Sequence, residues 1–222
     1  MNGLKENHLK INESVLLACK KSGRSPQDIT LVAVSKTKPI TLIEEAYQLG
    51  LRHFGENYVQ EWQEKYESLK HLDIKWHFIG HLQRRKVKDI VGKVALIHSV
   101  DSIELLEEIN KRAGNAGIKQ RCLLQINIGN ESSKSGLAMD HVLDFMNAAQ
   151  NCPHVLLEGL MIIPPASEDP EQTRPYFSQT KKLSDQLGLK QISMGMSGDF
   201  EVAIEEGASL IRVGTSLFGN RS

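Results

Sequence analysis

The chain has 222 residues, of which 40% are hydrophobic and 24% charged, the composition of an ordinary globular protein. Lys+Arg and Asp+Glu both number 27, so the zero net charge gives no sign of steering toward nucleic acid or an anionic membrane. No apolar run approaches the roughly 20 residues of a membrane span, and the polar amino terminus is unlike a signal peptide. Cys19, Cys122 and Cys152 form no CxxC pair and no zinc spacing, which favours a reduced, cytoplasmic setting.

After a helix expected over Leu4–Lys21, the first strand is expected within Ile29–Pro39, ITLVAVSKTKP. Its apolar run is typical of a strand buried on both faces in a parallel sheet. Lys36 follows that run, at the strand end where α/β barrels carry their chemistry. A lysine partly withdrawn from water becomes a nucleophilic amine, and Lys38 would add to this effect if the strand extended that far. The alternative is that both lysines form the solvated cap of a strand.

Seven further strands are expected, over His53–Asn57, Trp76–Gly80, Ala95–Val100, Arg121–Ile128, Leu157–Ile163, Gln191–Ser197 and Leu210–Thr215. Helices are expected over Leu42–Leu49 with Thr41 as N-cap, Tyr58–Leu69, a basic Leu82–Val91, a stretch capped by Asp101 or Ser102, Met139–Gln150, Thr173–Leu187 and Phe200–Glu206. Such alternation predicts a parallel sheet closed into a single (β/α)8 TIM barrel, with one extra N-terminal helix, over residues 1–222. A doubly wound open sheet is the alternative, although that fold rarely needs eight units.

Glycines and hydroxyl residues follow the last two predicted strands. Ser197 and Gly198 end the seventh strand, and Gly214 and Thr215 end the eighth. Backbone N–H groups at these two strand ends would be available to a phosphate, which predicts an anion site there. The alternative is that both segments are plain turns and that Asp199 is only an N-cap.

Two further polar residues occupy strands or strand ends. Arg212 lies inside the apolar strand LIRVGT and therefore needs either a polar ligand or a buried carboxylate partner. Asn57 ends the second strand, where it could bind a ligand or cap the next helix.

The remaining polar candidates are weaker. His77 and His81 flank a glycine, but two histidines without a third ligand argue poorly for zinc. His53 and His98 are expected in the core or at its rim. Lys134 lies on a polar loop, where it could be a second ligand lysine or part of an ordinary flexible loop.

A lysine able to form an imine, placed opposite a phosphate cradle on one barrel, suits pyridoxal 5′-phosphate (PLP). The segments VAVSKTKP, HFGENYVQE, WHFIGHLQ, INIGNESSKSG and SMGMSGDFEVAIEEGASLIRVGTSLFG resemble the pyridoxal phosphate homeostasis protein family. That family's fold is like the N-terminal barrel of alanine racemase, fold type III among PLP proteins. The resemblance implies that Lys36 holds PLP as a Schiff base. The other residues that it implies are Ser197, Gly198, Gly214 and Thr215 for the phosphate, Arg212 near the ring or phosphate, Asn57 beside the ring, and Lys38 and Lys134 as accessory lysines.

The resemblance also implies a role without catalysis: binding PLP, limiting its free level and delivering it to apo-enzymes. The competing hypothesis is an amino-acid racemase, which needs an acid/base group on each face of the cofactor. Alanine racemase-like enzymes take one such group from a second domain or subunit, and we expect this chain to lack that domain. If Arg212 contacted the pyridine nitrogen, its fixed charge would make the ring a weaker electron sink. A third hypothesis is a cofactor-free aldolase acting through Lys36. We expect a monomer without nucleic-acid or membrane partners.

Overall fold

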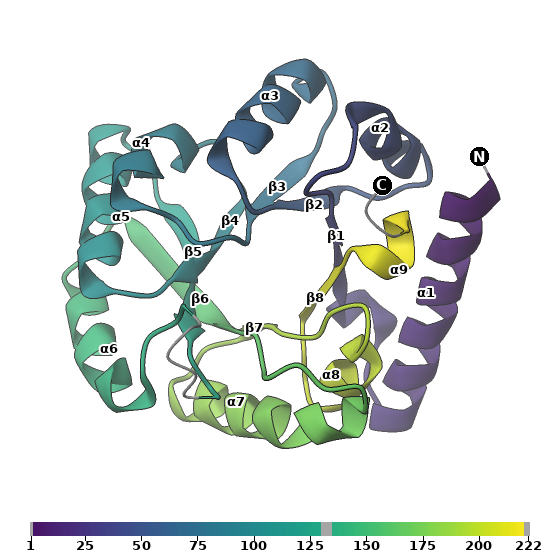
Figure 1. The fold of residues 1–222 in the computed structure, drawn as a ribbon. Coiled ribbons are helices and arrows are strands. Elements are labelled where there is room, and N and C mark those ends of the chain that lie inside the picture. The colour runs from purple at the N-terminus through teal and green to yellow at the C-terminus, as the bar shows by residue number, and fades with distance from the viewer. Residues whose placement is uncertain (1, 130–134, 220–222) are drawn as a thin grey trace.

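A computed structural model of the chain describes residues 2–129 and 135–219, and its central feature is a closed parallel barrel (Figure 1). The strands follow one another around the barrel in chain order, from β1 (Thr30–Val34) to β8 (Leu210–Val213). β8 then pairs with β1 in parallel, with Thr30 opposite Leu210 and Ala33 opposite Val213. The predicted (β/α)8 barrel is therefore confirmed.

The other strands are β2 (His53–Glu56), β3 (Lys75–Phe78), β4 (Leu96–Val100), β5 (Gln120–Ile126), β6 (Val155–Ile162) and β7 (Gln191–Ser193). The α-helices are α1 (Asn2–Ser22), α2 (Ile40–Gln48), α3 (Val59–Leu69), α4 (Val87–Ile90), α5 (Ile103–Asn115), α6 (Val142–Gln150), α7 (Arg174–Gln186), α8 (Phe200–Glu205) and α9 (Thr215–Phe218). The 3-10 turns are η1 (Pro26–Asp28), η2 (Arg84–Lys86), η3 (Met139–His141) and η4 (Pro170–Thr173). Helices surround the barrel, and α1 is the predicted extra helix, lying outside α8 and α9 (Figure 1).

Several strands end earlier than the sequence predicted. β1 stops at Val34, two residues before Lys36, and β7 stops at Ser193, four residues before Ser197. Beyond β1 the chain turns through Thr37, whose φ of 62° lies in the left-handed region and cannot continue a strand. Lys36 and Lys38 therefore do not share a strand face, and the predicted influence of Lys38 through such a face does not apply.

Two predictions about helices were wrong. The basic segment over residues 82–91 forms only the 3-10 turn η2 and the single turn α4, and Gly92, with a φ of 79°, follows them. Thr41 does not cap α2, because the helix already begins at Ile40 with Pro39 at the N-cap position. Ser102, one of the two predicted caps of α5, does cap it: its hydroxyl accepts a 3.2 Å bond from the Leu105 amide.

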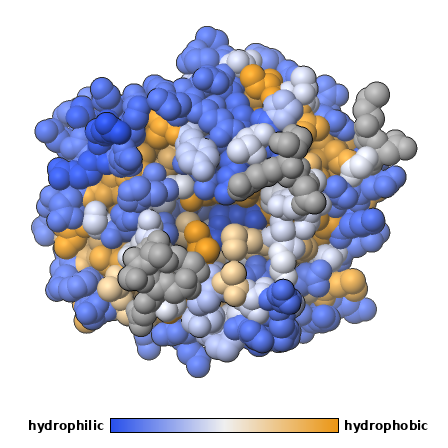
Figure 2. All heavy atoms as spheres, in the orientation of Figure 1, coloured by the Kyte–Doolittle hydropathy of each residue, from blue (hydrophilic) through white to orange (hydrophobic). Residues whose placement is uncertain are grey.

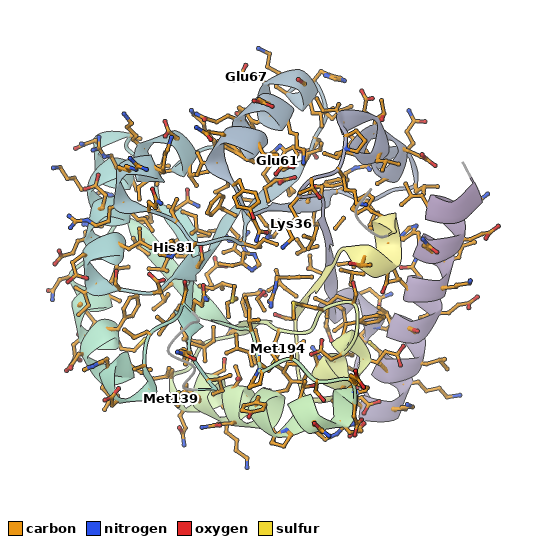
Figure 3. All side chains as sticks on the ribbon, in the orientation of Figure 1. Lys36, Glu61, Glu67, His81, Met139 and Met194 are labelled. Carbon is orange, nitrogen blue, oxygen red and sulfur yellow. The ribbon has the colours of Figure 1, made fainter. Side chains whose placement is uncertain are left out.

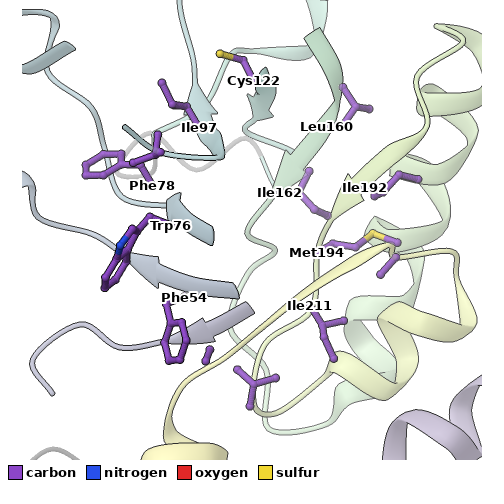
Figure 4. Packing of buried hydrophobic residues seen from close by; sticks show 14 of the residues in the cluster. Phe54, Trp76, Phe78, Ile97, Cys122, Leu160, Ile162, Ile192, Met194 and Ile211 are labelled. Atoms are coloured by element: carbon purple, nitrogen blue, oxygen red, sulfur yellow. The ribbon is translucent and has the colours of Figure 1, made fainter. Parts of the chain in front are cut away.

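The barrel wall separates two hydrophobic clusters. The larger packs the outer face of the strands against the helices, and Figure 4 shows Phe54, Trp76, Ile97 and Ile211 among its members. The smaller comprises Val32, Leu96, Leu123, Met161 and Leu210. Strand side chains alternate between the faces of the sheet, so this second cluster fills the barrel interior. That interior also contains buried polar side chains, which lead to the site described below.

Two chain-wide features complete the fold. Among the described residues, no helix combines the length and apolar character needed to cross a bilayer. The three cysteines are free thiols with buried side chains.

Candidate functional site

A cavity of about 300 Å³ opens at the carboxyl end of the barrel strands. Figure 2 shows this face hollowed near its middle, with hydrophilic residues at the floor of the hollow. The polar lining consists of Lys36, Asn57, Ser197, Gly198, Arg212, Gly214 and Thr215, and the apolar lining of Val34, Ile79, Ile163 and Met196. Among the described residues, the cavity therefore brings together every predicted site residue except Lys38.

The backbone on both sides of Lys36 is held by residues from other elements. The Ser35 carbonyl, in the peptide group before Lys36, accepts bonds from Lys65 Nζ at 2.7 Å and from the Lys38 amide at 3.0 Å. The Thr37 amide, in the peptide group after it, donates to the Glu61 carboxylate. In Figure 3, Lys36 lies near the middle of the barrel mouth with Glu61 beside it, toward α3. We term the contacts of Lys65 and Glu61 the Lys36 clamp.

The Lys36 clamp contains a buried group of charges. Lys65 is only 5% exposed, and its ammonium lies 2.7 Å from both Glu56 Oε1 and Glu61 Oε1. The Ser35 hydroxyl also donates to Glu56 Oε1, at 2.7 Å. Burial raises the pKa of Glu56, and the charge and hydrogen bond of Lys65 oppose that rise. A buried charged group of this kind gives little net stability but fixes geometry, because each member is costly to leave unpaired.

Lys65 and Glu56 were not predicted as site residues from the sequence, although a signal was present. The buried positions of α3 are Val59, Trp62, Lys65 and Leu69, so a lysine occupies the apolar stripe of an amphipathic helix. A charged residue on a buried face requires a partner, and Glu56 in the short strand β2 provides it. The stripe alone could have identified Lys65 as a structural or site residue.

Backbone amides converge on one oxygen at the ends of β7 and β8. The amides of Gly214 and Ser216 donate to Ser197 Oγ, at 3.3 Å and 3.2 Å. The Ser216 hydroxyl in turn donates to the Ser197 carbonyl, at 3.3 Å. The hydroxyl oxygen of Ser197 thus lies between two N–H donors, an arrangement that can also hold an anion oxygen.

Arg212 reaches the cavity from inside the barrel wall and is 4% exposed. Its Nη1 donates to Ser193 Oγ at 2.6 Å, and its Nη2 donates to the Ile162 carbonyl at 2.9 Å. Burial lowers the pKa of Arg212 to about 10, and the charge of Asp199 opposes this shift, so the guanidinium is a cation at neutral pH. Among the described residues no carboxylate lies within ion-pair distance of it, so the buried Arg–carboxylate pair is not observed.

Asn57 follows β2, and its backbone position depends on Gly80. A Cβ at Gly80 would lie 2.1 Å from the Asn57 carbonyl oxygen, so only glycine allows this close approach. Asn57 does not cap α3, whose N-cap residue is Tyr58. Its Oδ1 is buried with no hydrogen-bond partner among the described residues, although it lies at the cavity wall.

The other predicted residues lie elsewhere. Lys38 Nζ donates to the Gly219 carbonyl at 3.1 Å and thereby contacts the end of α9. Lys134 lies outside the described residues. His81 is exposed and 3.4 Å from Asp101, whereas His77 is buried inside the barrel. The two histidines therefore belong to different environments.

The fold has counterparts among known proteins. The family model for the alanine racemase N-terminal domain matches residues 19–222. A pyridoxal phosphate homeostasis protein from Aquifex aeolicus is 46% identical over 96% of this chain and 96% of its own length. Its Escherichia coli counterpart is 36% identical over 100% of this chain and 98% of its own. PipY from Synechococcus elongatus, solved with PLP bound, is 37% identical and superposes with a TM-score of 0.83 over 94% of this chain and all of its own.

Proposed function

The chain belongs to the pyridoxal phosphate homeostasis protein family, and from this premise we propose that it binds PLP and serves to buffer and deliver this cofactor. The observation that carries the proposal is the placement of a primary amine and an oxygen-binding amide in the same cavity. Lys36 supplies the amine and Gly214 the amide, and the amide of Ser216 binds the same oxygen from just outside the lining. An amine opposite an anion cradle is the donor set that a phosphorylated aldehyde requires.

The residues present fit PLP in three further respects. The cavity, at about 300 Å³, is at the small end of the usual range for ligand sites, as suits a single-ring cofactor. Arg212 offers a cation beside the cradle, and the buried Asn57 oxygen lacks a partner in the described chain. Ile79 and Ile163 supply apolar surface for a ring. We assign the phosphate to Ser197, Gly198, Gly214 and Thr215, and the ring to Asn57 and Arg212.

We propose that Lys36 holds the cofactor covalently. Its deprotonated Nζ condenses with the aldehyde, forming a carbon–nitrogen double bond as the aldehyde oxygen leaves as water. When bound, the cofactor supplies an electron-withdrawing ring, which is the chemistry that PLP enzymes use. The chain's own residues act by holding: the Lys36 clamp fixes the amine, the amide pair fixes the anion, and Arg212 keeps a permanent positive charge in the cavity wall.

A carrier role suits this site better than racemisation. Racemisation requires a proton donor and acceptor on opposite faces of the ring. Among the described lining residues Lys36 is the one with an ordinary acid/base side chain, because the guanidinium of Arg212 stays protonated. We further propose a cytoplasmic monomer that hands PLP to apo-enzymes, which is compatible with the three free cysteines.

Borohydride reduction followed by peptide mapping tests this proposal. The cofactor should be found on the peptide that contains Lys36 and should be absent from Lys36→Ala. Lys190→Ala, which changes an exposed lysine outside the cavity, is the control and should bind as the unmodified chain does. A label on another lysine, or rapid racemisation of any common amino acid, would refute the proposal.

A further inference from the structure

A chain of hydrogen bonds crosses the barrel interior beneath the cavity. His53 Nδ1 lies 2.8 Å from His77 Nε2, and His77 Nδ1 lies 2.8 Å from His98 Nε2. His98 Nδ1 lies 2.8 Å from Ser193 Oγ, which accepts the 2.6 Å bond from Arg212 Nη1. We term the three histidines and Ser193 the histidine relay. Five residues from five strands are thus joined end to end, and the last of them lines the proposed cofactor cavity.

The stagger of the barrel strands produces this path. His53 is the first residue of β2, and the residue opposite His77 is Gly55, two positions further on. His77 in turn lies opposite Leu96, two positions before His98. Inward-facing residues alternate along each strand, so every step to the next strand also rises by one inward position. The histidine relay therefore climbs from the amino end of β2 toward the cavity.

Arg212 sets the direction of these hydrogen bonds. A guanidinium has no acceptor, so Ser193 Oγ must accept from it. Among the described residues the side chain of Ser193 has one other partner, His98, and so its hydroxyl hydrogen points to His98 Nδ1. His98 then carries its hydrogen on Nε2 and donates to His77, which by the same reasoning donates to His53. All three rings are neutral Nε2–H tautomers in this arrangement.

The charge state of the rings agrees with that assignment. Burial lowers the pKa of His77 to about 3 and that of His98 well below its ordinary value. Burial, helped by Lys75 and Arg121, also lowers the pKa of His53, which is half-buried at the far end of the relay. The charged groups around the relay are Lys75, Arg121, its partner Glu158 at 2.8 Å, Arg212, and Asp199, which faces Arg212. His53 is thus the ring that takes up a proton most readily.

We propose that His53, His77 and His98 are positioning residues for Arg212, acting through Ser193, and that protonation of His53 loosens the hold of Arg212 on the cofactor. This inference rests on the proposed function, which assigns Arg212 to bound PLP. Protonated His53 donates from both nitrogens, so His77 must present Nε2 as an acceptor. Only His53 gains a proton, while His77 and His98 exchange the Nε2–H tautomer for the Nδ1–H one.

The consequence falls on Ser193. In the reversed arrangement its oxygen accepts from both His98 and Arg212, and its own hydrogen loses its acceptor. Hydrogen bonds in a chain polarise one another, so a hydroxyl that no longer donates is a poorer acceptor for Arg212. We expect PLP binding to weaken as pH falls below 6.5, the ordinary pKa of histidine, by about fivefold beyond the effect of the phosphate's own titration.

The first test uses the cofactor-free protein. Long-range ¹H–¹⁵N correlation spectra distinguish the two histidine tautomers. At about pH 8 the three relay histidines should be Nε2–H tautomers, and His77 and His98 should change together as His53 titrates. His53→Asn keeps an acceptor at this position but cannot titrate. In this variant the tautomers of His77 and His98 should stay unchanged on acidification. Nδ1–H tautomers at high pH, or independent behaviour of the rings, would overturn the inference.

The second test measures PLP dissociation constants at about pH 8 and about pH 5.5. On acidification, the PLP affinity of the unmodified chain should fall about fivefold more than that of His53→Asn. The titration of the PLP phosphate affects both proteins equally and cancels in this comparison. His71→Asn replaces an exposed histidine before β3 and should show the same pH dependence of PLP affinity as the unmodified chain. Equal pH profiles for the unmodified chain and His53→Asn would refute the inference. A missing Schiff base on Lys36 would refute the proposed function alone, because the tautomer spectra need no cofactor.

Discussion

Lys65 Nζ donates a 2.7 Å hydrogen bond to the carbonyl oxygen of Ser35, the residue immediately before the proposed cofactor lysine. A buried ammonium from α3 therefore holds the main chain of the loop that follows β1. The same ammonium contacts the carboxylates of Glu56 and Glu61. The position of Lys36 thus depends on a residue much further along the chain, in a helix that does not itself line the cavity.

Replacing Lys65 should damage both stability and cofactor binding. Lys65→Met removes one of the two donors to the Ser35 carbonyl and leaves the buried Glu56 carboxylate without its cation, which should cost about 3–5 kcal/mol of unfolding free energy. Schiff-base formation should also slow, because the Lys36 loop loses one side of its clamp. Urea unfolding and the rate of appearance of the imine absorbance measure the two effects.

Lys70→Met is the matched control for that change. Lys70 follows α3, and its side chain is 68% exposed beside Glu67, so its loss should alter neither property measurably. Lys65→Met with unchanged stability and an unchanged rate of imine formation would show that the Lys36 clamp has no role.

Arg212 should not tolerate replacement by lysine. Its two nitrogens serve Ser193 and the Ile162 carbonyl at once, and a lysine ammonium cannot reproduce that planar fork. We expect Arg212→Lys to weaken PLP binding about tenfold or more. Spectrophotometric titration measures the change, with the exposed Arg84→Lys as the control. A dissociation constant within twofold of that control would contradict the assigned role.

Gly80→Ala should disturb the site through the main chain. The added Cβ would lie 2.1 Å from the Asn57 carbonyl oxygen, and backbone cannot move aside as a flexible side chain can. We expect a loss of roughly 2–3 kcal/mol in stability and weaker PLP binding. Gly3→Ala, where a Cβ meets nothing within 4 Å, should leave binding intact and not reduce stability. Calorimetry and titration of both variants decide the matter.

Acid should destabilise the fold through the buried histidines. The pKa of His77 is about 3 in the folded chain and 6.5 in the unfolded chain, so the unfolded state binds more protons as pH falls. The contribution of neutral His77 to the free energy of unfolding is therefore fully present above pH 6.5. It is lost progressively as the pH falls to about 3. His77 alone should contribute roughly 4 kcal/mol of this loss. Urea unfolding at a series of pH values should show the free energy of unfolding falling between these two pH values. A constant free energy there would contradict the burial of a neutral ring.

The barrel could be predicted from sequence because its signal is local and repeated. Each strand is a short apolar run, and each is followed by a helical pattern or a turn. The first and seventh strands were predicted to extend too far, to Lys36 and Ser197. Loops that line a cavity carry the same small and polar residues as strand ends, so the sequence does not separate the two. The cavity residues could be placed because parallel strands all end on one rim.

The histidine relay and the Lys36 clamp could not be predicted in the same way. His53, His77 and His98 come from three strands, and their contacts depend on the stagger between strands, which local patterns do not encode. Glu56 and Lys65 are each unremarkable until β2 and α3 pack together. Interactions between elements require the register, and the sequence pattern supplies only the elements.

The cavity spans the seam where β8 closes against β1, with Lys36 on one side and Gly214 on the other. A chain emerging from the ribosome possesses its amine early, but the amide pair forms only after the eighth strand has been synthesised and docked. The complete site therefore exists only after the barrel has closed. A ligand that contacts both sides of this seam would bind only the closed barrel and would therefore stabilise it against opening between β1 and β8.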